Sequence, residues 1–276
     1  MRSKHVISIE ALSYNYPDGT NVLDSIDLEL EAGEFVVLVG PNGCGKSTFS
    51  RHLNGLLRPT TGSVKVMGMD TREPSSLWNI RQAVGMVFQD PNVQFIGSTV
   101  EEDIAFGLEN LALPPGEIEK LVSESLAVTD MEKYRYFSLG SLSGGQKQKA
   151  AIAGALAMGS KFLVLDEVTS MLDSHSCTEV LNIVISLKNK GIGLLHITHR
   201  PEEILIADRV LVMDQGRIVA DGTPLVVIRE LGFDHDLFEI PPLMKLALKL
   251  EDAGVIRLNG CEMSPLSLTE EICRSL

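Results

Sequence analysis

The chain has 276 residues, a length that suits one large α/β domain or one domain with a smaller companion. Its 24 basic and 37 acidic side chains give a net charge of −13, which argues against a surface that grips nucleic acid through phosphates. No apolar run approaches the roughly 18 residues of a membrane span, and residues 1–5 lead into no long apolar stretch. We therefore expect no signal peptide, and a cytosolic chain that reaches a membrane only through a partner.

The four cysteines have no metal-ligand spacing and are typical of free thiols in a reducing compartment. They are Cys44, Cys177, Cys261 and Cys273.

The first strands alternate in polarity, whereas the third is wholly apolar. Residues 6–14 and 22–30 alternate apolar and polar side chains, and residues 35–39 are Phe-Val-Val-Leu-Val. Alternation is typical of a half-buried strand, and a short apolar run is typical of a buried one. This order predicts an antiparallel layer that leads into a parallel sheet.

Residues 40–48 have the sequence G-P-N-G-C-G-K-S-T between that apolar strand and a helical pattern. Glycines let the backbone curl so that several N–H groups point at one phosphate, and the helix N-terminus adds its positive dipole end. Lys46 is placed to reach the β- and γ-phosphates, and the Ser47 hydroxyl to ligate Mg²⁺. The alternative is a chance match in a glycine-rich turn. The candidate nucleotide-binding residues are Gly40, Pro41, Asn42, Gly43, Cys44, Gly45, Lys46, Ser47 and Thr48.

A mostly helical insertion follows the next buried strand. That strand covers residues 84–88 and ends at Gln89. Residues 98–101, Ser-Thr-Val-Glu, predict a capping box that starts a helix, and residues 114–115, Pro-Pro, predict its break before a second helix at about 117–127. We expect this insertion to span about residues 90–159.

Another apolar run, residues 162–165, closes with Asp166 and Glu167. Strand carboxyl ends form the ligand-binding edge of open α/β sheets, so Asp166 is placed to hold Mg²⁺ there. Glu167 is placed to orient or deprotonate a water that attacks the γ-phosphate. The alternative is a strand that ends in two exposed acids.

A further buried strand, residues 194–198, ends at His199, and residues 210–220 predict a hairpin around Gln-Gly.

Residues 142–146, Leu-Ser-Gly-Gly-Gln, precede a helix of good formers. Small residues at a helix start leave backbone amides free for a second anion site. A flexible Ser-Gly turn is the alternative. The candidate ligands here are Ser143, Gly144, Gly145 and Gln146.

With these motifs in this order, the chain resembles the ATP-binding-cassette (ABC) ATPases over residues 1–222. Residues 142–146 are similar to that family's signature sequence, and residues 170–173 to its D-loop, which ends at Asp173. Gln89 matches the Q-loop glutamine, His199 the switch histidine and Tyr16 the adenine-stacking aromatic. The resemblance implies a P-loop cassette with a RecA-like parallel sheet core, an antiparallel β layer and a helical subdomain, followed by a small helical extension over 223–276.

The resemblance also implies a mechanism that uses ATP and Mg²⁺. In this mechanism two cassettes, which are either copies of one chain or two related chains, pack head to tail. Each ATP lies between the phosphate loop of one cassette and the signature of the other. Glu167, His199 and Gln89 would serve catalysis, and Ser47, Gln89 and Asp166 would hold the metal. The sequence departs from the family at three positions, none of which carries a catalytic atom: Val168, Arg200 and Lys149.

Residues 77–82, 85–91 and 99–107 resemble more narrowly the energy-coupling-factor subfamily. The resemblance implies a pair of ATPases on the cytoplasmic face of the membrane, a transmembrane coupling protein, and a small membrane protein that binds a vitamin or a transition-metal ion. The acids at 101–103 are placed to meet basic residues of the membrane partner, or they are ordinary acids at a helix start.

Two questions stay open at this stage. The tail from residue 223 carries an apolar stripe on a predicted helix after Pro242, and a predicted cap at 267–270; the stripe would serve dimerisation or pack on the same chain. Alternative functions are a soluble ABC ATPase that acts on a macromolecular assembly, the ATPase of a conventional ABC importer, and a phosphoryl-transfer kinase.

Overall fold

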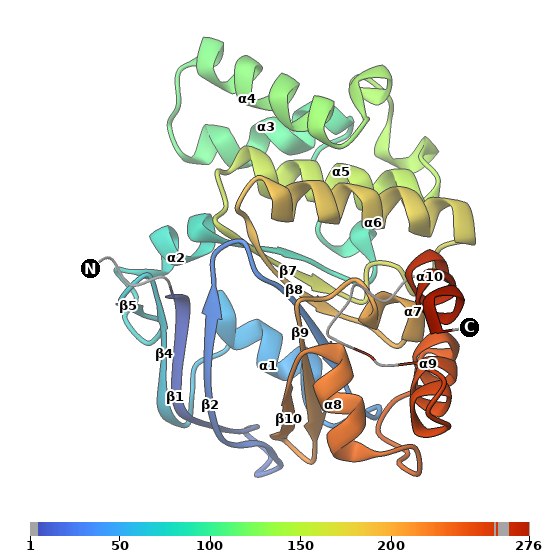
Figure 1. Ribbon diagram of the computed structural model, residues 1–276. Coiled ribbons are helices and arrows are strands. Elements are labelled where there is room, and N and C mark those ends of the chain that lie inside the picture. The colour runs from blue at the N-terminus through green and yellow to red at the C-terminus, as the bar shows by residue number, and fades with distance from the viewer. Residues whose placement is uncertain (1–4, 257, 259–264, 276) are drawn as a thin grey trace.

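The computed structural model describes residues 5–256, 258 and 265–275 of the chain. Two sheets stack in the lower part of the molecule (Figure 1). The smaller sheet has four antiparallel strands in the order β2-β1-β4-β5. Its strands are β1 (His5–Asn15), β2 (Asn21–Glu31), β4 (Thr61–Val66) and β5 (Met69–Asp70).

The larger sheet has six strands in the order β10-β9-β3-β8-β7-β6. All neighbours pair in parallel except β9 and β10, which form the predicted hairpin. Strand β3 is wholly apolar and β7 is apolar up to Asp166, and both are buried on both faces, as is typical of parallel sheets. The strands are β3 (Phe35–Val39), β6 (Val84–Val87), β7 (Phe162–Asp166), β8 (Gly193–Ile197), β9 (Arg209–Asp214) and β10 (Arg217–Gly222).

Helices cover both faces of the larger sheet. Helix α1 (Lys46–Leu53) lies between the two sheets, where Phe49 and Leu53 join their shared core. Helix α6 (Ser174–Asn189) covers the opposite face, together with α5 (Gly144–Ala157). The short helices α2 (Leu77–Ala83) and α7 (Pro201–Ile204) flank the sheet.

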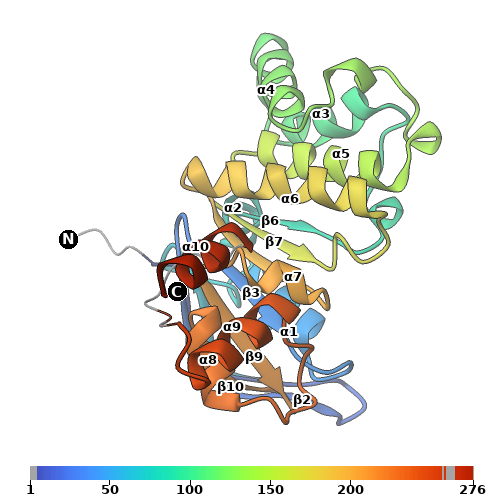
Figure 2. The same cartoon turned by 45° about the vertical axis from the view of Figure 1, so that its right-hand side comes forward.

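A separate helical block stands above the sheets in Figures 1 and 2, and α5 joins it to them. Its other helices, α3 (Val100–Asn110) and α4 (Pro115–Val128), share an apolar core with α5. Three single 3-10 turns accompany the block: η1 (Pro91–Val93), η2 (Glu132–Tyr134) and η3 (Leu139–Ser141).

The last three helices pack beside the larger sheet, as Figure 2 shows: α8 (Pro224–Leu231), α9 (Pro242–Asp252) and α10 (Pro265–Ser275). One side of α9 packs on Ile228 of α8 through Met244 and Leu248. Its predicted stripe is mostly covered within the chain, because Ala247 packs with Leu268 of α10. Leu246, also in that stripe, is 50% exposed.

Two predicted helix starts are wrong by a short distance. The capping box of α3 uses Thr99 and Glu102 instead of Ser98 and Glu101. Two adjacent hydroxyl residues and two adjacent acids make both registers possible in the sequence, but Glu101 pairs with Arg135 and Glu102 is the acid that accepts from the N–H of Thr99. Helix α10 starts at Pro265, so residues 267–270 lie inside it.

Within the described residues, none of the helices has the length and apolarity needed to cross a membrane.

Candidate active site

Four parallel strands deliver the candidate residues to one edge of the sheet. The phosphate loop follows β3, His199 follows β8, Asp166 ends β7 and Gln89 follows β6. These strands are neighbours in the order β3-β8-β7-β6, so their carboxyl ends lie side by side. This is the edge at which open α/β sheets bind ligands.

The backbone of the phosphate loop requires glycine at its first position. Gly40 has φ of 149°, and a Cβ there would lie 2.1 Å from the carbonyl oxygen of Met213. The last glycine, Gly45, has φ of 112° and precedes α1 directly. The loop therefore curls tightly against β9 and presents the start of α1 to a phosphate.

Lys46 is held inside this loop. Its Nζ donates hydrogen bonds to the carbonyl oxygens of Gly40 (2.8 Å) and Pro41 (2.9 Å). The side chain is buried, and the Sγ atom of Cys44 lies 4.0 Å from the same Nζ. The ammonium group is thus positioned where phosphate oxygens would replace the carbonyl oxygens as its partners.

Ser47 and Asp166 form the candidate metal site. The Ser47 hydroxyl donates to Oδ1 of Asp166 at 3.2 Å. Burial raises the pKa of the Asp166 carboxyl, although the bond from Ser47 lowers it. A hydroxyl beside a carboxylate at a phosphate loop is an oxygen donor set that fits Mg²⁺, which takes its remaining ligands from water and phosphates. The described residues contain no cluster of three acidic, histidine or cysteine side chains that could hold a metal ion.

Glu167 and His199 contact each other directly. Nε2 of His199 lies 3.1 Å from Oε1 of Glu167. Glu167 has φ of 53°, an uncommon conformation for a non-glycine residue. Its backbone N–H donates to the carbonyl oxygen of Ile197, which fixes this turn to β8. Contacts between β7 and β8 therefore set the direction of the carboxylate.

Gln89 reaches the backbone of Glu167 through one intermediate residue. Its Nε2 donates to the Ser170 hydroxyl at 3.2 Å, and that hydroxyl donates to the carbonyl oxygen of Glu167 at 2.8 Å. The buried Gln148 of α5 in turn donates to the carbonyl oxygens of Phe88 and Gln89. The sequence placed Ser170 in the D-loop but did not predict its contact with Gln89, and it did not identify Gln148, because only the tertiary fold brings these residues to this loop.

The signature residues and Tyr16 complete the set. Ser143 caps α5 by a capping box with Gln146, whose Nε2 also donates to the Tyr134 hydroxyl at 2.8 Å. These contacts lie within the helical block, and no described hydrogen bond joins the signature residues to the phosphate loop of the same chain. The Tyr16 hydroxyl lies 3.1 Å from the Thr48 hydroxyl, which places its ring beside the loop.

The three acids at the start of α3 have ion-pair or hydrogen-bond partners within the chain. Glu101 pairs with Arg135, and Glu102 accepts from the backbone of Thr99. Asp103 accepts from the backbone N–H groups of Ile96 and Gly97. These contacts favour the interpretation that the acids stabilise the helix start.

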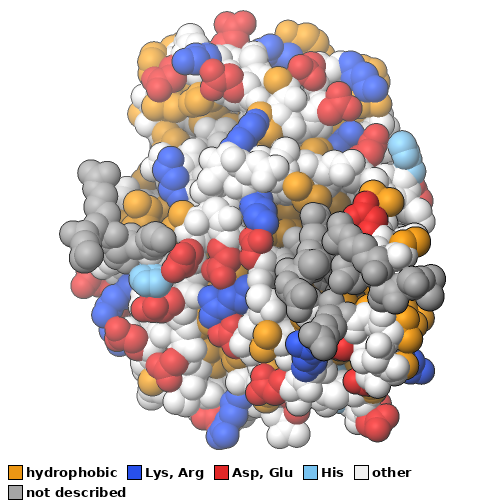
Figure 3. Space-filling view, in the orientation of Figure 1, with side chains coloured by type: hydrophobic (Ala, Val, Ile, Leu, Met, Phe, Trp, Pro, Cys, Tyr) orange, Lys and Arg blue, Asp and Glu red, His pale blue; other side chains and the backbone are white. Residues whose placement is uncertain are grey.

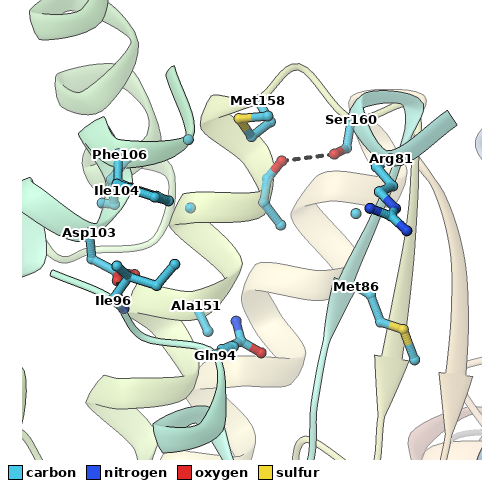
Figure 4. Close-up of a pocket in the computed structure, with 14 residues that line it drawn as sticks. Arg81, Met86, Gln94, Ile96, Asp103, Ile104, Phe106, Ala151, Met158 and Ser160 are labelled. Carbon is cyan, nitrogen blue, oxygen red and sulfur yellow. Dashed lines mark hydrogen bonds between the residues drawn. The ribbon is translucent and has the colours of Figure 1, made fainter. Parts of the chain in front are cut away.

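A groove lies beside the acids, between the sheet and the helical block. It encloses about 230 Å³ and is lined from α2, β6, α3 and α5. In Figure 4, Arg81 and Met86 lie on one side and Phe106 on the other, with Met158 above. Ile96 and Phe106, at its rim, are 67% and 41% exposed.

Comparisons with known proteins identify the family of the chain. The sequence profile of the ABC transporter family matches residues 23–170. The energy-coupling factor transporter ATP-binding protein EcfA of Methanosarcina acetivorans is 50% identical over 269 residues, 98% of this chain and 98% of that protein. The cobalt import ATP-binding protein CbiO of Syntrophus aciditrophicus is 42% identical over 274 residues, 98% of this chain and 96% of that protein. The solved structure of cbiO1 from Clostridium perfringens, part of the ABC transporter complex cbiONQ, has a TM-score of 0.78 at 33% identity and covers 91% of this chain and 98% of its own.

The chain belongs to the ABC transporter family, as an ATP-binding and ATP-hydrolysing cassette. More narrowly, its full-length relatives place it among the energy-coupling factor ATP-binding proteins, which confirms both the fold class and the subfamily expected from the sequence.

Proposed function

We propose that the chain powers an energy-coupling-factor importer from the cytoplasmic face of the membrane, with a vitamin or a transition-metal ion as cargo. The observation that carries the proposal is the convergence of Lys46, Asp166, Glu167 and His199 on one sheet edge in a full-length relative of such ATPases. The cobalt import protein among its relatives supports the metal-ion branch of this proposal.

Each residue at the edge has a role in ATP hydrolysis under this proposal. Lys46 and the loop amides would bind the phosphates, with Tyr16 against the adenine. Glu167 would orient the attacking water and accept its proton, and His199 would contact the γ-phosphate. Ser47, Asp166 and Gln89 would hold Mg²⁺, whose charge offsets the charge that develops on the phosphates.

A second cassette, identical or related, would complete the site. Among the described residues, Ser143–Gln146 make hydrogen bonds only within their own helical block. The capping box uses the N–H groups of Ser143 and Gln146, which leaves those of Gly144 and Gly145 for the nucleotide of a partner. Met171, in the segment that ends at Asp173, is 73% exposed, which suits a residue covered by a second subunit. ATP would then hold two cassettes together, and hydrolysis would release them.

The groove of Figure 4 is the docking site that we propose for the transmembrane coupling protein. Its exposed Ile96 and Phe106 offer apolar contact, and Gln148 links the neighbouring helix to Gln89. Docking there would let movement of the membrane protein reach the ATP site. A small substrate-binding membrane protein would complete the transporter.

The tail at 223–276 remains a proposed contributor to dimerisation. Because most of the α9 stripe is covered by α8 and α10, the contact would use exposed residues such as Leu246 and Leu266.

Figure 3 shows that the acidic and basic side chains of one face are interspersed, with apolar side chains gathered over the left end of the helical block. We propose no nucleic-acid partner.

Replacing Glu167 with Gln tests the catalytic assignment. Glu167→Gln keeps the size and one hydrogen-bond acceptor but removes the base, so kcat should fall by about 10²-fold or more while ATP affinity is retained. Turnover is measured by phosphate release, and binding by titration with ATP. Glu230→Gln, at an exposed site on α8, is the matched control and should keep full turnover. Undiminished hydrolysis in Glu167→Gln would refute the assignment.

A further inference from the structure

A buried carboxylate that the proposed chemistry does not use lies behind the switch histidine. Glu203 is on α7, four residues after His199, and is 1% exposed. An unpaired charge at this depth would be strongly unfavourable, so its partners indicate what it does.

Side chains from different elements meet this carboxylate. Nε2 of His196 lies 2.7 Å from Oε2, and the Cys177 thiol donates to Oε1 at 3.5 Å. Nδ1 of His196 has no partner among the described residues, so the bond to Glu203 is the one that orients this imidazole. Burial raises the pKa of the Glu203 carboxyl, but the hydrogen bond and charge of His196, together with the nearby hydroxyls of Thr198 and Thr169, outweigh burial and bring the pKa down to about 2.

These contacts join the segments that carry the site. His196 lies on β8, three residues before His199, and Cys177 lies on α6, whose N-cap is Asp173 of the D-loop. A second tie lies nearby, because Nη1 of Arg200 donates to the carbonyl oxygen of Thr169 at 3.2 Å, just before the D-loop. The segment after His199 is thus joined to the chain on both sides of the D-loop: Arg200 contacts Thr169 before it, and Glu203 contacts Cys177 after it.

We propose that Glu203 is a positioning residue, which holds His199 within reach of Glu167 and makes the switch segment move together with the D-loop. The inference rests on the proposed roles of His199 and Glu167. A Glu203 that served packing alone would affect stability without a selective effect on turnover, so the two roles can be separated.

The test compares kcat with nucleotide affinity in the full chain. Glu203→Gln keeps the volume but weakens the charge-assisted bond to His196, so kcat should fall about tenfold while KM and the Kd for ATP change less than about twofold. His196→Gln keeps an N–H donor near the position of Nε2 and should retain most activity. His196→Ala leaves Glu203 without this donor and should lose as much kcat as Glu203→Gln.

Val184→Ala is the control for stability, because it removes volume from the same helix α6 outside this network. It should lower the melting temperature and leave kcat unchanged well below that temperature. Three results would each overturn the inference. The first is an unchanged kcat in Glu203→Gln, and the second is a loss of both kcat and ATP affinity in that variant. The third is an equal loss of kcat in His196→Gln and His196→Ala. If Glu203→Gln does not fold, the two His196 variants still decide it. Full activity in His199→Ala would instead refute the proposed function, whereas an inactive His199→Ala with active Glu203→Gln refutes only this inference.

Discussion

At the scale of single residues, the site consists of mutually restrained pairs. Ser47 bonds Asp166, His199 contacts Glu167, and Gln89 bonds Ser170, so few of these side chains move independently. Catalytic groups need such restraint, since small displacements of a reacting group cost large factors in rate. The pairs also connect different loops, which lets a change at one loop alter the others.

The reactivity of Cys44 should depend on pH and nucleotide. Burial raises the pKa of its thiol despite the nearby Lys46, so the reactive thiolate is scarce near neutral pH. Alkylation should therefore accelerate as the pH rises, block ATP binding, and slow when ATP is present. Peptide mass analysis separates Cys44 from the exposed Cys273. A protein fully alkylated at Cys44 that still binds ATP normally would contradict this prediction.

Glu203 should contribute to stability in a defined pH range. Its pKa is about 2 in the folded chain and roughly 4.3 when unfolded, so the unfolded chain takes up the proton first as pH falls. The stability that the charged carboxylate contributes is complete above about pH 5 and is lost progressively toward about pH 2. The difference in unfolding free energy between the wild type and Glu203→Gln should therefore shrink on acidification. Urea unfolding at several pH values measures this difference, and a constant difference would show that the contact is not made.

At the scale of elements, parallel strand order creates the site and caps position its helices. Strands β3, β8, β7 and β6 bring segments more than 100 residues apart to one edge. Helix α1 begins at the phosphate loop, and α5 begins at the signature. The local sequence at these two helix starts therefore supplies the residues that we propose bind the phosphates.

The cap of α3 gives a direct test at this scale. Thr99→Ala removes the side-chain acceptor for the N–H of Glu102 and should cost about 1 kcal/mol of unfolding free energy. Ser98→Ala, one residue earlier, is the matched control and should cost clearly less. Denaturant unfolding compares the two variants, and a larger loss in Ser98→Ala would favour the register expected from the sequence.

At the scale of the whole molecule, the sequence predicted the core and the order of its motifs, because wholly apolar strands and glycine loops leave local signals. The strand at Phe35–Val39 and the turn at Gly40 are examples. Contacts made by Gln148 and Glu203 leave no such signal, since they depend on which elements become neighbours. The fate of the α9 stripe was open for the same reason: apolar periodicity indicates that a face is buried, but not which surface covers it.

The most direct test of the central claim is purification of the tagged chain from detergent-solubilised native membranes, with its partners identified by mass. We expect a polytopic coupling protein and a small substrate-binding membrane protein to co-purify, with the bound ligand of the latter defining the cargo. The variant Phe106→Glu, in the docking groove, should lose these partners while keeping ATP binding. If the wild-type chain brings only soluble proteins, the importer assignment is contradicted and the chain is an ABC ATPase that acts on a soluble assembly.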